Sequence, residues 1–271
     1  MLLLTALNKN FYRTSSQIEK RIRFVVSALI MTAVMFIATF FFFDKAIFLI
    51  PLLFILSYGV TYFSVLQGIE GIEWLLLFLM PVMFTIVFYL FYLLFPVRWL
   101  TRLPFIIIYG FSLYAMLLTS NIFNVGVEKS LQLYRAAFSV NYFYQTFVMF
   151  LAASVMFAFH LNPFLNGLLM FIITFLLSLQ VLWSVRPKVF VERNLIHYSI
   201  FISTLVVQLG IVLSFIPIKL SIAALIITAV YYSVCGLLYH YIEQKLFSQT
   251  IREYVFVICF VCAIVLLSLQ W

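Results

Sequence analysis

The chain has 271 residues, of which 66% are hydrophobic and 9% are charged, with a formal net charge of +8 and a mean hydropathy of +1.21. Apolar runs of about 18 residues or more recur along its length without the period-2 alternation of barrel strands, which excludes a water-soluble protein and a transmembrane β-barrel. The basic residues lie between these runs, where they favour membrane orientation and anionic lipid over nucleic acid as a partner.

The sequence therefore predicts an all-α fold, a polytopic transmembrane helical bundle of about nine spans. Residues 1–22 are expected to form a basic cytoplasmic segment. This segment has its apolar stretch before its charges, the reverse of a signal peptide, so no cleaved presequence is expected. Residues 23–271 are predicted to be a single transmembrane helical domain. Its spans are expected at about 23–43, 46–66, 74–96, 103–123, 136–160, 164–184, 195–216, 220–240 and 254–270.

The distribution of Lys and Arg predicts how these spans are oriented. With nine spans and the N-terminus inside, twelve of the sixteen basic residues fall in cytoplasmic segments and four in exterior ones. If the second run did not cross the membrane, the two sides would hold eight each. The positive-inside rule therefore favours nine spans with the N-terminus inside and the C-terminus outside.

The longest polar interruption, Asn124 to Arg135, leads directly into the predicted fifth span. From here a polar stripe with spacings of 4 and 3 residues continues along one helix face: Glu128, Gln132, Arg135, Ser139, Tyr142 and Thr146. The cost of burying charge in a bilayer places the first half of this stretch at the cytoplasmic interface. Two interpretations remain, an interfacial elbow held by lipid phosphates or a set of specific head-group contacts made by Arg135, Arg186, Lys188 and Arg193.

Spans five to eight also carry uncharged polar residues that recur on single faces, and in span eight these are Ser221, Thr228, Tyr232 and Cys235. Such side chains in a membrane either hydrogen-bond between helices or line a wet cavity. The sequence leaves both readings open for this predicted intramembrane polar seam, which consists of Asn141, Gln145, Asn166, Gln180, His197, Thr204 and Gln208.

The stretch Asn121 to Ala137, with the sequence NIFNVGVEKSLQLYRAA, and the Phe- and Tyr-rich span after it resemble a family of uncharacterised multi-pass membrane proteins from candidate-phyla bacteria. Elsewhere the likeness is limited to the hydrophobic layout. The resemblance implies residence in a bacterial cytoplasmic membrane. It implies no activity and carries over no functional residue.

Recognisable catalytic motifs are absent from the sequence, which contains no G-x-S-x-G, no H-E-x-x-H, no P-loop and no Cys or His cluster with metal-ligand spacing. We therefore expect no catalytic, cofactor or metal site. The first hypothesis is a structural or interaction component of a bacterial membrane assembly, with membrane lipids and other membrane proteins as partners. The alternative is a carrier or scramblase for an apolar or lipid-like substrate that uses the polar faces of spans five to eight. A third hypothesis is a polyprenyl-phosphate-dependent membrane enzyme, with Asp44 as its catalytic acid.

Overall fold

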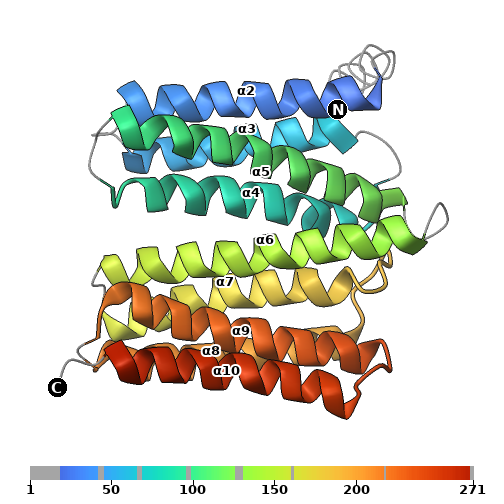
Figure 1. Cartoon of the computed structure of the whole chain (residues 1–271). Helices are drawn as coiled ribbons and strands as arrows, with labels where there is room; N and C mark the ends of the chain where they lie inside the picture. The colour runs from blue at the N-terminus through green and yellow to red at the C-terminus, as the bar shows by residue number, and fades with distance from the viewer. Residues whose placement is uncertain are drawn as a thin grey trace. The chain divides into compact units, whose positions relative to one another are not determined.

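The computed structural model describes residues 19–41, 46–65, 69–95, 99–125, 131–159, 162–216 and 218–268. Asp44, Glu128 and Lys129 lie outside these ranges. Within them every element of regular secondary structure is an α-helix (Figure 1). The helices are α2 (Lys20–Phe41), α3 (Ala46–Val65), α4 (Glu73–Tyr92), α5 (Trp99–Val125), α6 (Leu131–Ala158), α7 (Pro163–Trp183), α8 (Arg193–Ser214), α9 (Leu220–Ile242) and α10 (Ser248–Ser268).

Each of the nine predicted spans coincides with one of these helices, and all nine are long and apolar enough to cross a membrane. The all-α prediction is confirmed for the described ranges. Two helices begin about five residues or more before their predicted spans, because a hydropathy pattern marks only their apolar part. α6 begins at Leu131 and includes Arg135 in its second turn, and α10 begins at Ser248.

The chain divides into two compact units, Met1–Val140 and Asn141–Trp271, with the division inside α6. In the first unit α2 packs on α3 and α5, and α4 packs on the same two helices. Hydroxyl groups link these helices, since Ser64 donates to the Ser27 hydroxyl at 2.8 Å and Ser120 donates to the Leu77 carbonyl oxygen at 3.0 Å. Bonds of this kind suit helices in a membrane, where no apolar driving force brings helices together.

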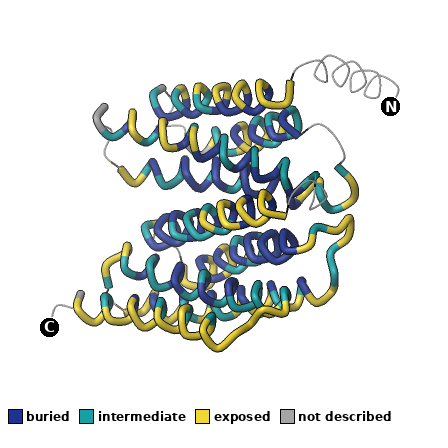
Figure 2. Tube along the Cα trace, turned by 45° about the vertical axis from the view of Figure 1, so that its right-hand side comes forward, coloured by how far each residue is buried: buried dark blue, intermediate teal, exposed yellow. Residues whose placement is uncertain are grey.

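In the second unit α7 packs on α8, α8 on α9, and α9 on α10. The start of α7 is set by sequence: the Asn162 side chain accepts a hydrogen bond from the Phe164 amide at 3.1 Å, and Pro163 occupies the first helical position. α10 has little cover. Among its described residues Val261 alone is buried, and Figure 2 shows most of the helix coloured as exposed, with some intermediate segments.

Candidate functional site

Three amide side chains and one tyrosine form a buried, hydrogen-bonded cluster in the second unit. The Asn141 amide donates to the side-chain carbonyl oxygen of Gln180 at 3.1 Å, and the Gln145 amide donates to the same oxygen. The Tyr231 hydroxyl donates to the side-chain carbonyl oxygen of Gln145 at 3.0 Å. We call these four residues the amide cluster.

The amide cluster joins three helices, since Asn141 and Gln145 lie on α6, Gln180 on α7 and Tyr231 on α9. Its amides are sealed from solvent, with 2%, 0% and 2% of Asn141, Gln145 and Gln180 exposed. Tyr231 is also fully buried. Because polar groups in a low-dielectric interior are costly unless paired, this mutual bonding fixes the register of α6, α7 and α9.

A group of aromatic side chains continues from the amide cluster toward α10. The Tyr142 hydroxyl donates to the Tyr232 carbonyl oxygen, and their rings stack with centroids 5.1 Å apart. The Tyr232 ring in turn lies 5.5 Å from that of Tyr254 on α10. Tyr254 sits directly over Gly236 of α9, where even a Cβ atom would collide with its ring. The glycine is therefore what lets α10 approach α9.

The structure does not bring the other residues of the predicted polar seam into the amide cluster. Asn166 is buried, but it precedes Gln180 by fourteen residues, about 21 Å along the helix. Its side-chain oxygen has no hydrogen-bond partner within the described part of the chain. His197, Thr204 and Gln208 share one face of α8, and that face is exposed.

Sequence reasoning missed Tyr231 and the buried face of α8. Tyr231 lies three residues after Thr228 and four before Cys235, both of which are buried, so helical spacing could have identified it. On α8 the buried polar residues are Ser199 and Ser203, whose hydroxyls donate to the carbonyl oxygens four residues earlier at 2.8 and 2.6 Å. Hydroxyls satisfied in this way can be buried without a partner on another helix.

The polar stripe on α6 divides into two kinds of side chain. Gln132, Arg135 and Ser139 are exposed, and the Ser139 hydroxyl donates back to the Arg135 carbonyl oxygen at 3.1 Å. Tyr142 and Thr146 are half-buried, and Thr146 likewise donates to the carbonyl oxygen of Tyr142 at 2.9 Å. The stripe is thus exposed from Gln132 to Ser139 and enters the packed interior at Tyr142.

Three of the four predicted head-group residues lie in or beside the loop between α7 and α8. Arg186, Lys188 and Arg193 are exposed there, as Arg135 is on α6. Trp183 is almost fully buried, and its indole N–H donates to the Lys188 carbonyl oxygen at 2.9 Å. The Lys188 ammonium forms an ion pair with Glu192, so much of its charge is already compensated.

A hollow of about 420 Å³ adjoins this loop, with lining that comes from the loop and from α8 and the end of α9. Arg186, Glu192, Asn194 and Gln244 supply polar groups, and the rings of Tyr198 and Tyr241 meet edge to face with centroids 6.3 Å apart. The Arg186 guanidinium and the Glu192 carboxylate give the hollow charges of both signs.

Two arginines of the first unit are buried, which the sequence did not indicate. Arg23 is 1% exposed on α2 and Arg102 is 7% exposed on α5. The Arg102 guanidinium lies 4.7 Å from the centroid of the Phe40 ring, a cation–π contact that offsets part of the cost of burying its charge.

The described residues contain no group of three or more His, Cys, Asp or Glu side chains that could hold a metal ion. Cys235 is buried, and Cys259 and Cys262 are exposed on α10. In comparisons with known proteins, no family model, no curated protein and no solved structure matches this chain.

Proposed function

We propose that the chain is a multi-pass protein of a bacterial cytoplasmic membrane, with its N-terminus inside and its C-terminus outside, which acts as a structural or interaction component of a membrane assembly. The observation that carries the proposal is the amide cluster. Asn141, Gln145 and Gln180 are three of the five amide residues of the predicted polar seam, and they bond to one another in a buried interior. Amides arranged in this way stabilise helix packing and are not available to a passing solute.

The exposed surface of α10 supports the interaction part of the proposal. Among the described helices, α9 is the one with which α10 makes substantial contacts. Large apolar side chains such as Phe256, Phe260 and Leu267 are exposed along α10. Membrane lipid and a neighbouring protein helix can both cover such a surface. Anionic lipids are the proposed partners of the exposed basic residues Arg135, Arg186, Lys188 and Arg193.

The competing carrier or scramblase can be tested in vesicles that contain the purified full chain and a fluorescent phospholipid. Dithionite added outside quenches only the label in the outer leaflet, so the assay measures how fast lipid crosses. We expect the rate of protein-free vesicles. Faster crossing that depends on Gln145 and Gln180 would overturn the proposal and favour transport.

The interaction role can be tested with the native cysteines of α10. A membrane-permeant bismaleimide applied to intact cells is expected to join Cys259 or Cys262 to a neighbouring protein in one discrete product. The variant with Cys259→Ser and Cys262→Ser keeps only the buried Cys235 and should give none. If the native chain stays entirely uncoupled while both thiols react with a monofunctional maleimide, no neighbouring protein places a thiol within reach of this helix, which contradicts the expected product.

A further inference from the structure

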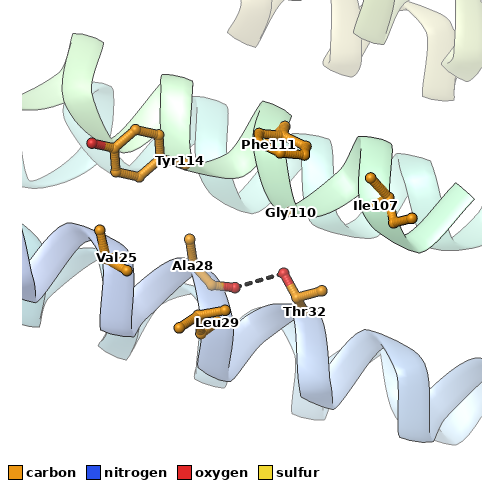
Figure 3. A pocket seen from close by; sticks show the side chains of 8 residues that line it. All are labelled: Val25, Ala28, Leu29, Thr32, Ile107, Gly110, Phe111 and Tyr114. Carbon is orange, nitrogen blue, oxygen red and sulfur yellow. Dashed lines mark hydrogen bonds between the residues drawn. The ribbon is translucent and has the colours of Figure 1, made fainter. Parts of the chain in front are cut away.

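An apolar groove lies between α2 and α5 in the first unit, with a volume of about 360 Å³ (Figure 3). This volume falls within the range of about 300–1,000 Å³ that is usual for small-ligand pockets. α2 contributes Val25, Ala28, Leu29 and Thr32 to the groove. The Thr32 hydroxyl donates to the Ala28 carbonyl oxygen at 2.6 Å, so the polar group of this wall is hydrogen-bonded within its own helix.

The α5 wall consists of Ile107, Gly110, Phe111 and Tyr114. A Cβ atom at Gly110 would lie 2.7 Å from the Thr32 hydroxyl oxygen, so the glycine allows the two helices to meet closely and close the floor of the groove. The rim remains open, because 63% of Leu29 and 74% of Phe111 are exposed. The groove is therefore a shallow, apolar channel along the outside of two helices.

The length of the groove suits a lipid chain. From Val25 to Thr32 it follows α2 for about 10 Å at the usual helical rise. The hydrocarbon of one bilayer leaflet is about 15 Å deep, half of the full core. A lipid acyl chain that enters near Val25 would therefore lie in the groove over most of the hydrocarbon depth of one leaflet.

One end of the groove carries charge of the sign that a lipid phosphate requires. Arg21 precedes Val25 by four residues, so it lies on the same face of α2, about 6 Å further toward the end of the helix. Its side chain is exposed, whereas that of Arg23 is buried. The Tyr114 ring lies across from Val25 and Ala28, and its hydroxyl points toward this same end (Figure 3). A guanidinium and a phenol at the mouth of an apolar groove are together complementary to a phosphate with an attached acyl chain.

We propose that the groove between α2 and α5 is a binding site for an anionic glycerophospholipid. One acyl chain lies between Leu29 and Phe111, and the phosphate is held by Arg21 with the Tyr114 hydroxyl beside it. This site is separate from the predicted head-group residues Arg135, Arg186, Lys188 and Arg193, because none of them lines the groove. It is an addition to the proposed structural role, and it holds whether or not the protein has a protein partner at α10.

The test uses the full chain in phosphatidylcholine vesicles that contain phosphatidylglycerol and a trace of phosphatidylglycerol with a photoactivatable acyl chain. After illumination, mass spectrometry maps the labelled peptides. Labelling is expected to concentrate on the α2 and α5 peptides that hold Val25 to Thr32 and Ile107 to Tyr114. Arg21→Gln should lower it by about fivefold, the factor expected for one basic residue near an anionic lipid surface. Val25→Trp, at an exposed position on the rim, should lower it by filling the groove.

Matched controls come from α10, where Arg252 and Val255 are also an exposed basic residue and an exposed valine in the first turns of a helix. Arg252→Gln and Val255→Trp should leave labelling of α2 and α5 unchanged. Unlabelled phosphatidylglycerol should compete, and added phosphatidylcholine should not. Labelling that is equal on α2, α5 and α10, or unaffected by Arg21→Gln and Val25→Trp in protein that stays monodisperse, would overturn the site. Labelling that falls as the protein-to-lipid ratio rises, at a constant ratio of probe to protein, would assign the groove to a second copy of the chain instead.

Discussion

Gln145 and Gln180 are joined by a buried hydrogen bond between α6 and α7, in which the Gln145 amide donates to the side-chain oxygen of Gln180. The same oxygen accepts a second bond from Asn141, 3.1 Å away. One acceptor thus satisfies two donors from successive turns of α6. Gln180 is the residue on which the amide cluster depends, and its removal leaves both donors buried without a partner.

We predict that Gln180→Leu lowers the free energy of unfolding by about 1–3 kcal/mol, the usual cost of leaving buried polar groups unpaired. Reversible unfolding of the purified protein in mixed detergent micelles measures the change. Gln208→Leu is the matched control, because Gln208 is exposed on α8. It should change stability by no more than about 0.5 kcal/mol. Equal losses for the two variants would mean that the buried bonds contribute nothing.

Two helical glycines should respond in opposite directions to the same substitution. A Cβ atom at Gly236 would collide with the ring of Tyr254, so Gly236→Ala is expected to destabilise the contact between α9 and α10 by about 1–3 kcal/mol. At Gly59 nothing lies within 4 Å of a Cβ atom. Gly59→Ala should therefore stabilise the protein by about 0.5–1 kcal/mol through helix propensity alone. Thermal unfolding that gave both variants the same sign would contradict the packing described for α10.

The basic loop after α7 should become more accessible to protease when the hydrogen bond from the Trp183 indole is removed. Trp183→Phe retains most of the buried ring but loses the N–H that donates to the Lys188 carbonyl oxygen at 2.9 Å. We expect trypsin to cleave after Lys188 several times faster in this variant. Trp74→Phe is the control, because Trp74 is 40% exposed and far along the chain from the loop. An unchanged cleavage rate in Trp183→Phe would show that the loop is held by other contacts.

The orientation of the chain in the membrane can be determined with reporter proteins fused to it. Alkaline phosphatase fused after Trp271 should be active and green fluorescent protein at the same position should be dark, because the distribution of Lys and Arg predicts that this end lies outside. Fusions after Gln244, between α9 and α10, should give the reverse result. A fluorescent fusion after Trp271 would refute the proposed topology.

Hydropathy was sufficient to predict the nine helices, because a membrane span is recognised by composition and length, which are local properties. It underestimated α6 and α10 at their polar first turns, where the helix continues beyond its apolar part. The pairing of Asn141, Gln145 and Gln180 with one another could not be predicted, since it depends on the register between α6 and α7, which the residue types do not specify.

The polar residues of α8 illustrate a second limit. Spacing correctly indicates that His197, Thr204 and Gln208 share a face, but it does not say whether that face is buried. The buried face carries Ser199 and Ser203, whose hydroxyls bond to their own helix. A serine hydroxyl that donates to a carbonyl oxygen of its own helix can be buried without a partner on another helix. A search for large polar side chains therefore does not find it.

A double-mutant cycle between Gln145 and Gln180 tests most directly whether the amide cluster is a packing element. The free energy of unfolding is measured for the native chain, Gln145→Leu, Gln180→Leu and the double variant. If the two side chains stabilise each other, the double variant loses less than the sum of the single losses, by about 0.6–1.7 kcal/mol for a strong bond between membrane helices. Additive losses, with no coupling between the two positions, would contradict the account.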